Sequence, residues 1–388
     1  MRSFDTIVLG VGAMGSAALY HLARKRRRVL GIDRFSPPHA MGSTHGDTRI
    51  TRLAIGEGEQ YTPLARRSHT LWRELEAETG ETLLTACGGL VISSRGTSAH
   101  THVEHFFANT VAAARKFGIA HELLDAADIR RRFPQFRVAD AEHGYFEPDA
   151  GFVRPERCVA AHLRAAERRG ATIVRGEKAT AFAATASGVT VTTERAVYAA
   201  ENLIVAAGPW LPSLVGEDIG NHFAIHRQAM FWFAADEPVD RFGAERCPVF
   251  IWEVTGRPQG IYGFPADEAG AVKIATERFE RSTTADAVDR EVSPGEIRAM
   301  HADYVAPYIT GVSARCVKAA TCLYTVTRDF GFVLDRHPTA ERVLLASPCS
   351  GHGFKHSPAI GEALAQAAAG ERPDFDWAPF ALRRFEQP

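Results

Sequence analysis

No apolar run in this 388-residue sequence reaches the roughly 18 residues that a membrane-spanning helix needs, which argues against an integral membrane protein. Its six cysteines are scattered, and no two form a C-x-x-C pair. That spacing is typical of reduced thiols and predicts a cytoplasmic protein without a disulfide framework. The formal net charge is −1, so no overall field favours nucleic acid or a membrane surface as a partner. The remaining composition, 45% hydrophobic and 23% charged, is typical of a soluble chain long enough for two domains.

A glycine-rich turn lies close to the N-terminus. The short apolar run Ile7–Leu9 that precedes it is typical of a buried parallel strand. Gly10, Gly12 and Gly15 follow at once, and a helical pattern begins at the next residue. In a dinucleotide-binding turn the first glycine bends the chain, the second admits a pyrophosphate to the backbone, and the third lets the helix pack closely on the strand. The free N–H groups at the helix start then face the phosphates.

A second apolar strand, Val29–Ile32, ends at Asp33, where an acidic side chain can bind a ribose hydroxyl. Strand, glycine turn, helix, strand and acid in this order predict a site for an adenine dinucleotide. A glycine-rich turn without a ligand is the alternative.

The segment 35–54 is rich in Pro, Gly, Ser, Thr and His and predicts a functional loop. Arg49 and Arg52 lie three residues apart in it, so a helical turn would put both guanidinium groups on one face, where they could bind an anion. A surface pair on a turn is the alternative.

Three histidines, His100, His102 and His105, are spaced in a way that suggests metal ligands. The surrounding A-H-T-H-V-E-H-F-F indicates an amphipathic helix with exposed histidines, and no carboxylate or thiol stands at ligand spacing. We therefore predict no metal site.

The rest of the chain divides into two kinds of pattern. Helical patterns and buried strands alternate in one part, with helices at 61–79, 120–137, 154–169 and 293–307, strands at 88–93, 171–174, 202–207 and 342–346, a loop at 144–151 and a tight turn at Gly208. Residues 219–285 instead show alternating strand patterns and predict a separate, mostly antiparallel sheet. After the last buried strand comes a second glycine loop at 351–356. Ser357 and Pro358 then predict an N-cap and the first turn of a helix that ends at Gly370, with its start facing the nucleotide.

These patterns predict an α/β protein whose nucleotide-binding domain is interrupted by a second domain. We assign 1–85, 145–218 and 322–388 to the nucleotide-binding domain, and 86–144 and 219–321 to a substrate domain built of an antiparallel sheet and helices.

A series of short motifs, taken in order, is specific to one family. They are the N-terminal glycine turn, H-G-D-T-R-I-x-R at 45–52, Y-G-F-P at 262–265, Lys273, C-L-Y-T at 322–325 and S-G-H-G-F-K at 350–355. Together they resemble the monomeric sarcosine oxidase and N-methyltryptophan oxidase family over nearly the whole length. The resemblance implies a Rossmann-like FAD-binding domain of the glutathione-reductase/DAO type. It also implies an oxidase that converts the C–N bond of secondary, N-methyl α-amino acids to an imine while O2 becomes H2O2.

The resemblance also implies roles for single residues. Cys322 matches the cysteine that carries FAD covalently, and Arg52 and Lys355 match the pair that holds the substrate carboxylate. Lys273 matches the lysine that activates oxygen. Tyr262 and Tyr324 match aromatic walls of the substrate cavity, and His45, Thr48 and Arg49 match residues packed near the flavin. With the glycine turns added, the expected cofactor contacts are Gly10, Gly12, Gly15, Asp33, Thr48, Gly208, Cys322, Gly351, Gly353, Phe354 and Lys355.

One position departs from the family. Glu277, four residues after Lys273, stands where sarcosine oxidases carry an active-site histidine, and this leaves open whether sarcosine itself is a substrate. No general acid–base pair is evident in the sequence, and none is required if the amine binds in its neutral form. Two cations such as Arg52 and Lys355 would repel each other in an apolar cavity, so we expect the substrate carboxylate to bridge them.

Several alternatives stay open at this stage. They are an oxidase of cyclic imino acids such as pipecolate or proline, a flavin amine dehydrogenase with another electron acceptor, a nicotinamide dehydrogenase, and a flavin-binding subunit without activity. The expected partners are a small amino acid and O2, and the expected oligomeric state is a monomer or a weak homo-oligomer.

Overall fold

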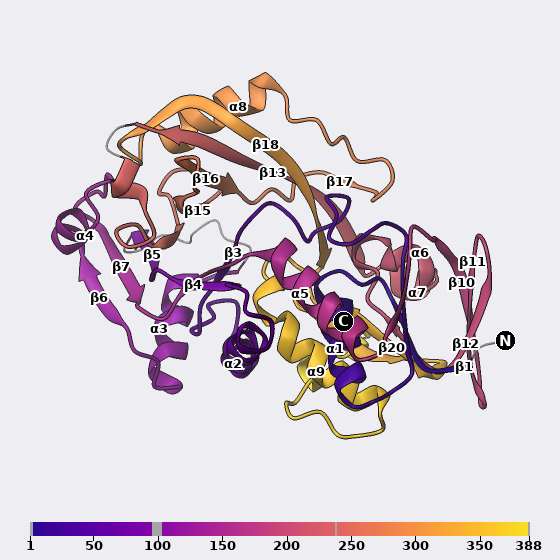
Figure 1. The fold of residues 1–388 in the computed structure, drawn as a ribbon. Helices are drawn as coiled ribbons and strands as arrows, with labels where there is room; N and C mark the ends of the chain where they lie inside the picture. Colours follow the sequence, from indigo (N-terminus) through magenta and orange to yellow (C-terminus); the bar gives the residue numbers. More distant parts are fainter. Residues whose placement is uncertain (1–2, 95–102, 237–238, 387–388) are drawn as a thin grey trace.

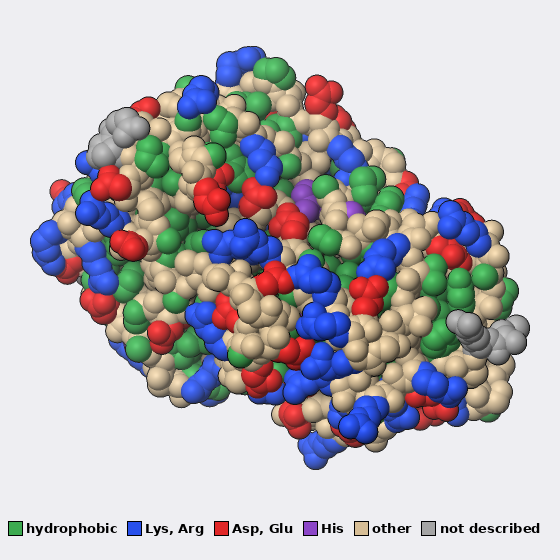
Figure 2. Space-filling model, in the orientation of Figure 1, with side chains coloured by type: hydrophobic (Ala, Val, Ile, Leu, Met, Phe, Trp, Pro, Cys, Tyr) green, Lys and Arg blue, Asp and Glu red, His purple; other side chains and the backbone are tan. Residues whose placement is uncertain are grey.

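The computed structural model describes residues 3–94, 103–236 and 239–386. Two large sheets make up the two ends of the molecule, and long helices gather beneath the first of them (Figure 1). The long strands β13 (Phe223–Ala235) and β18 (Val312–Thr327) run from the second sheet back towards the first. Charges of both signs are interspersed over the face drawn in Figure 2, in keeping with the net charge of −1.

The first sheet contains the N-terminal strand and has eight strands. Its members are β1 (Ser3–Leu9), β2 (Val29–Asp33), β9 (Thr172–Arg175), β10 (Ala179–Thr185), β11 (Gly188–Thr193), β12 (Val197–Val205), β19 (Val333–His337) and β20 (Ala340–Ser347). β1 lies between β12 and β2 and is parallel to both, while β9 extends β2 and β20 extends β12 in the same direction. The predicted Rossmann-like sheet is confirmed, with its last strands supplied from the end of the chain.

Helices from distant parts of the sequence pack together beside this sheet. They are α1 (Ala13–Arg24), α2 (Thr62–Thr79), α5 (Pro155–Arg168) and α9 (Ser357–Ala368). α1 and α9 lie against the strands of the sheet, and α2 and α5 lie against those two helices. α9 packs closely on α1 because Gly361 carries no side chain: a Cβ there would lie 2.4 Å from the Cβ of Ala17. The helical predictions for 61–79 and 154–169 are confirmed.

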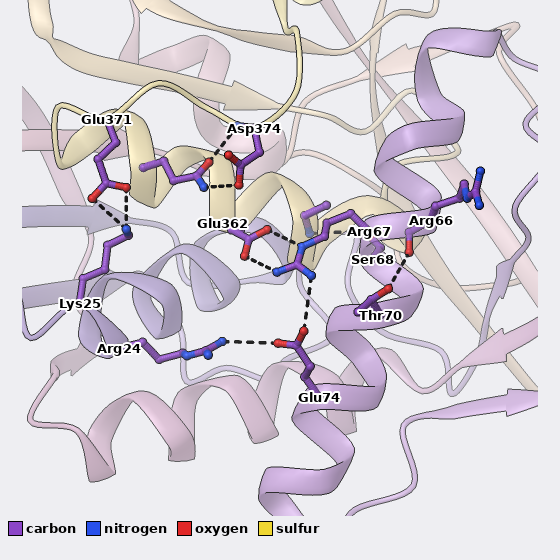
Figure 3. Close-up of polar contacts among 12 residues, drawn as sticks. Arg24, Lys25, Arg66, Arg67, Ser68, Thr70, Glu74, Glu362, Glu371 and Asp374 are labelled. Carbon is purple, nitrogen blue, oxygen red and sulfur yellow. Dashed lines mark hydrogen bonds and ion pairs between the residues drawn. The ribbon is translucent and has the colours of Figure 1, made fainter. Parts of the chain in front are cut away.

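Ion pairs on the surface join the same helices (Figure 3). Arg67 of α2 forms an ion pair with Glu362 of α9 at 2.7 Å. Glu74 of α2 forms ion pairs with Arg67 of the same helix and with Arg24 of α1. Exposed pairs of this kind contribute roughly 0–1 kcal/mol each, so the network positions the helices more than it stabilises them.

The second sheet has nine strands. Besides β13 and β18 it contains β5 (Gly89–Ser94), β6 (Glu122–Asp125), β7 (Glu142–Glu147), β14 (Val249–Trp252), β15 (Ile261–Ala266), β16 (Ala271–Thr276) and β17 (Ser282–Thr283). Among the described strand pairs of this second sheet, β14 and β5 form the only parallel one. The prediction of a mostly antiparallel sheet is therefore confirmed. The remaining helices are α3 (Phe106–Lys116), α4 (Ala126–Arg132), α6 (Leu211–Leu214), α7 (Glu217–Gly220) and α8 (Pro294–Met300).

A small third sheet connects the two large ones. It consists of β3 (Arg49–Thr51), β8 (Gly151–Val153) and β4 (Leu84–Ala86), with β8 in the middle. Arg49 therefore lies in a strand and not in the helical turn that would place its guanidinium group on one face with that of Arg52. The two side chains have separate partners: Arg49 donates to the carbonyls of Thr48 and Ser43, and Arg52 binds Glu57.

Two further element predictions are wrong. The helix predicted over 120–137 is split into β6 and α4, because the Asp125 carboxylate accepts the Asp128 N–H at 2.7 Å and starts a helix only there. The loop predicted over 144–151 is largely strand: Gly144 to Glu147 belong to β7 and pair with β5 and β6. The predicted domain limits at 145 and 322 consequently fall inside β7 and β18, and the division into two domains stays a prediction.

The predicted histidine-bearing helix is shorter than expected. α3 begins at Phe106, and His105 precedes it with a left-handed φ of +57°. His100 and His102 lie outside the described residues. Within the described ranges no three His, Cys, Asp or Glu side chains are grouped to hold a metal ion, and no helix is long and apolar enough to cross a membrane.

Candidate functional site

A deep cleft runs along the carboxyl ends of the parallel strands and has a volume of about 1350 Å³ including its mouth. Predicted cofactor residues from both ends of the chain line it: Gly10, Gly12, Asp33, Gly208, Gly351, Gly353 and Phe354. Ligands bind at this edge in open α/β sheets.

The three N-terminal glycines have different surroundings. Gly10 has a φ of +83°, which turns the chain sharply after β1. A Cβ at Gly15 would lie 1.8 Å from the carbonyl oxygen of Gly10, so α1 can pack against the turn only with glycine there. A Cβ at Gly12 would meet only the Thr44 hydroxyl, at 3.6 Å, because Gly12 borders the cleft.

The start of α1 fits a phosphate group. Gly12 occupies the N-cap without any side-chain hydrogen bond, and the first turn contains no acidic residue. Gly12, Ala13 and Met14 line the cleft, and free N–H groups at a helix start are the donors that a pyrophosphate accepts from. The residues present therefore fit an adenine dinucleotide.

Asp33 supports the turn as well as lining the cleft. One carboxylate oxygen accepts the N–H of Val11 and the other accepts the N–H of Phe35, both at 2.9 Å. The expected contact with a ribose hydroxyl stays a prediction. The structure adds that Asp33 holds the glycine turn at the end of β2.

The C-terminal loop forms the opposite wall of the cleft. Gly351 has a φ of +82°, and a Cβ at Gly353 would lie 1.6 Å from the carbonyl oxygen of Pro348. A 3-10 turn, Phe354–His356, leads directly into α9. The predicted N-cap at Ser357 is therefore wrong: Ser357 is the first residue of α9, and its buried hydroxyl has no hydrogen-bond partner within the described part of the chain.

Replacing Gly15 with alanine should destabilise the fold, whereas replacing Gly12 should mainly impair cofactor binding. Overpacking typically costs about 1–3 kcal/mol, and at Gly15 the clash is with backbone. We expect a lower unfolding temperature for flavin-free G15A. G12A should unfold near the wild-type temperature and purify with less flavin. Equal unfolding temperatures for the two variants would contradict this assignment.

A second cavity of about 800 Å³ lies beside the first. Arg49, Tyr324, Gly351 and Phe354 line both cavities, so the two meet at these residues. The second cavity alone also contains Arg52, Glu57, Phe106, Tyr262, Glu277 and Lys355. The structure thus brings together most of the residues expected around a substrate.

Arg52 and Lys355 are joined by an anion from the protein itself. Arg52 Nη2 lies 2.5 Å from Glu57 Oε2, and Lys355 Nζ lies 3.9 Å from Glu57 Oε1. A protein carboxylate therefore already lies between the two cations, and the bridging of Arg52 and Lys355 by a substrate carboxylate stays a prediction. Glu57 lies in a Gly-Glu-Gly turn five residues after Arg52, and an acid between glycines beside a predicted cation is a signal that could have identified it.

The cation pair keeps binding capacity in spite of Glu57. Arg52 Nε is buried without a hydrogen-bond partner among the described residues, and the Arg52 guanidinium lies over the Phe106 ring at 4.9 Å. Lys355 Nζ donates to the carbonyl of His352 at 2.6 Å. Burial lowers the pKa of Lys355 to about 8, while the Glu57 charge acts in the opposite direction. With Lys355 protonated, the three groups carry one net positive charge.

Lys273 lies behind the cavities, because neither has it among its lining residues. Its ammonium donates to the carbonyls of Gly46 at 2.7 Å and Thr48 at 2.9 Å, and lies over the rings of Trp232 and Phe264. Burial, and then the nearby Arg49, lower the pKa of Lys273 well below its usual range. The predicted buried lysine of this strand is thus tied to the 45–52 segment.

The 45–52 segment carries its own charged and neutral groups. Arg49 donates to the carbonyls of Thr48 and Ser43 at 2.8 and 3.0 Å, so Thr48 O is shared by Arg49 and Lys273. Burial, assisted by Arg49 and Lys273, lowers the pKa of His45 to about 3, and its imidazole is neutral at pH 7. Arg49 reaches both cavities, whereas His45 and Thr48 are not among the residues that line them.

Cys322 is almost fully buried on β18, in an apolar cluster with Met230 and Tyr324, and Cys349 packs against that cluster. Burial raises the pKa of the Cys322 thiol, while Arg49 and Lys273 act against this rise. Cys349 lines the cofactor cleft, and Cys322 is not among its lining residues.

Comparison with known proteins agrees with this geometry. A family model described as FAD dependent oxidoreductase matches residues 5–367. A monomeric sarcosine oxidase of Streptomyces avermitilis is 40% identical over 94% of this chain and 94% of its own. An N-methyl-L-tryptophan oxidase of Salmonella heidelberg is 34% identical over 99% of this chain and all of its own. Among solved structures, the open form of the amino acid oxidase NikD superposes with a TM-score of 0.85 at 24% identity, covering 98% of each chain.

A dinucleotide cleft at the carboxyl ends of parallel strands, a charged cavity beside it and these relatives over nearly the full length lead to one conclusion. The chain belongs to the FAD-dependent oxidoreductase family, alongside the monomeric sarcosine oxidases and the N-methyl-L-tryptophan oxidases.

Proposed function

We propose that this protein is an FAD-dependent oxidase of secondary, N-methyl α-amino acids. The reaction oxidises the C–N bond to an imine, which water hydrolyses, while O2 is reduced to H2O2. The observation that carries the proposal is the second cavity: it holds Arg52 and Lys355 for a carboxylate and opens onto the cofactor cleft. Full-length relatives named after sarcosine and N-methyl-L-tryptophan support the substrate class.

The side chains of the cavity divide the work. Arg52 and Lys355 hold the substrate carboxylate and so fix which carbon faces the cleft. The rings of Tyr262 and Tyr324 line the cavity wall and exclude water from that carbon. FAD, when bound, accepts the hydride and later passes two electrons to oxygen. Lys273 and Arg49 supply the fixed positive charge that favours oxygen reduction nearby.

The remaining expectations are kept as part of the proposal. The partners are a small amino acid and O2, the oligomeric state is a monomer or weak homo-oligomer, and the location is the cytoplasm. Cys87, Cys158, Cys247, Cys316, Cys322 and Cys349 are all free thiols, which supports the last of these.

The test of the function is a panel of amino acids, their N-methyl derivatives and cyclic imino acids, read by peroxide formation. We expect a yellow protein that forms peroxide fastest with an N-methyl α-amino acid. Best activity with pipecolate or proline would instead identify a cyclic imino acid oxidase. Flavin reduction without peroxide, with turnover only on an added dye, would identify a dehydrogenase.

We also propose that FAD is attached covalently through Cys322. The thiol lies close to the Arg49 and Lys273 charges, which favour a thiolate. Acid-precipitated wild-type protein should stay yellow after washing, and Cys322→Ser should release its flavin into the supernatant. Cys349→Ser is the matched control, since Cys349 packs against the same cluster, and it should keep the flavin. Release from Cys349→Ser and not from Cys322→Ser would move the attachment to Cys349.

A further inference from the structure

Two carboxylates line the substrate cavity in the described part of the chain, Glu57 and Glu277. Glu57 is bound by Arg52 at 2.5 Å and belongs to the carboxylate-binding end. Glu277 belongs to a different part of the chain and directly follows the end of β16. The cavity therefore has a cationic end and a separate acidic side chain.

Glu277 lies where the two cavities meet. A Cβ at Gly351 would lie 2.9 Å from Glu277 Oε1 and 3.0 Å from the ring of Tyr324. Gly351 and Tyr324 are among the few residues that line both the cofactor cleft and the substrate cavity. A substrate whose C–N bond faces the cofactor must bring its nitrogen to this junction.

The charges around Glu277 suit a zwitterion. Lys355, Arg52 and Glu57 form the carboxylate-binding end, where burial lowers the pKa of Lys355 to about 8 and the charges of Glu57 and Glu277 oppose this shift. Tyr262 and Tyr324 line the same cavity, and burial and, to a lesser extent, the Glu277 charge raise the pKa of both phenols. Arg49 is the further cation at the junction. A molecule with one carboxylate and one ammonium thus meets opposite charges at its two ends.

Amino acids reach the enzyme with a protonated amine, because aliphatic amines have pKa values near 10. A hydride can leave the carbon only when the nitrogen lone pair is free to form the imine. Some group has to take that proton, and the sequence alone offers no evident general acid–base pair for this step. Glu277 is the carboxylate beside Gly351 and Tyr324, where the two cavities meet.

We propose that Glu277 binds the ammonium of the substrate zwitterion and accepts its proton before oxidation. The N–H bond breaks, an O–H bond forms on the Glu277 carboxylate, and the electron pair stays on nitrogen. No electrons are transferred in this step. The inference rests on the proposed amino acid oxidase function and specifies that the zwitterion is the species bound.

The test compares wild type, Glu277→Gln and Glu277→Asp in anaerobic flavin reduction by the best N-methyl amino acid, followed by stopped flow from about pH 6 to about pH 10. At pH near 7 the glutamine variant should lose roughly tenfold to a hundredfold in efficiency, as expected for a hydrogen bond to a charged group. The deficit should shrink as pH rises towards the pKa of the substrate amine, because more substrate then arrives neutral. The aspartate variant should retain part of the rate. Glu280→Gln, an exposed neighbour, is the control and should match wild type.

A second measurement separates this role from a structural one. Methoxyacetate has the carboxylate of sarcosine and an ether oxygen in place of its ammonium, so its binding should be unchanged or slightly tighter in Glu277→Gln. Equal losses for methoxyacetate and substrate, or a rate deficit that is the same at every pH, would overturn the proposal for Glu277. A wild-type enzyme that oxidises no amino acid would instead overturn the proposed function.

Discussion

Replacing Arg52 with alanine is expected to lower kcat/KM for the best N-methyl amino acid roughly 30- to several thousand-fold. Removing one partner of a buried charge pair costs about 2–5 kcal/mol, which corresponds to that range. Arg52 is 4% exposed and has a buried Nε donor that the described protein groups do not use. In the variant, Glu57 would also remain buried beside Lys355 alone, and its charge would oppose the substrate carboxylate. Steady-state peroxide assays measure the loss, and Lys355→Ala should fall in the same range.

The substrate itself provides the control for this prediction. A methyl ester of the best substrate keeps the amine and loses the anion, so wild type should oxidise it poorly. The decarboxylated amine should also be a poor substrate. Oxidation of the decarboxylated amine as fast as the acid would mean that Arg52 and Lys355 hold no carboxylate, and the protein would then be a general amine oxidase.

The pH dependence of substrate binding should reveal the protonation state of Lys355. With Lys355 protonated, it carries with Arg52 and Glu57 a net charge of +1, and a carboxylate neutralises the group. As pH rises through about 8, the lowered pKa of Lys355, the ammonium loses its proton and this attraction is lost. KM should therefore rise above that pH in wild type. Lys355→Met should have a high KM at every pH, without this step.

Sequence patterns predicted the parts of the fold that depend on local order. Gly10, Gly12 and Gly15 between two apolar strands specify a turn that the structure shows directly, and a Cβ added at Gly15 would lie only 1.8 Å from the Gly10 carbonyl oxygen. The alternating apolar and polar residues of 219–285 specify strands, because side chains in a strand point to opposite faces with a period of two residues. These features need no information from elsewhere in the chain.

Other features depend on contacts that local patterns do not contain. Residues 144–147 look like a loop because Gly144 interrupts them, yet they form a strand that β5 and β6 flank on both sides. Glu57 is an ordinary surface acid by composition and becomes a functional group only when β3 and the C-terminal loop bring Arg52 and Lys355 to it. The sequence shows that Glu277 departs from the family pattern. It does not show that Glu277 lies where the two cavities meet, because this position results from the packing of Glu277 close to Gly351 of the distant C-terminal loop.

Replacing Lys273 with methionine should slow the reaction of reduced enzyme with oxygen roughly a hundredfold or more, with a much smaller effect on flavin reduction. One preorganised electrostatic contact contributes about 3–4 kcal/mol to a charged transition state. Methionine keeps most of the volume between Trp232 and Phe264 but removes the charge and the hydrogen bonds to the Gly46 and Thr48 carbonyls. Stopped-flow measurement of both half-reactions separates the two effects. Equal slowing of both would mean that Lys273 supports the fold through the Gly46 and Thr48 carbonyls.

The lowered pKa of Lys273 also predicts how the rate of the reaction with oxygen changes with pH. An ammonium whose pKa is lowered by burial loses its proton at a lower pH than an exposed lysine, so oxygen reactivity should fall as pH rises and should be flat in Lys273→Met. Lys318→Met is the matched control. Lys318 Nζ also lies over the Trp232 ring, at 4.5 Å, but the side chain is exposed and paired with Asp47 at 2.6 Å. Lys318 does not share the hydrogen bonds that Lys273 donates to the Gly46 and Thr48 carbonyls, because its ammonium binds Asp47. If Lys318→Met also reacted slowly with oxygen, the effect would belong to Trp232 and the surface charge around it rather than to the buried ammonium of Lys273.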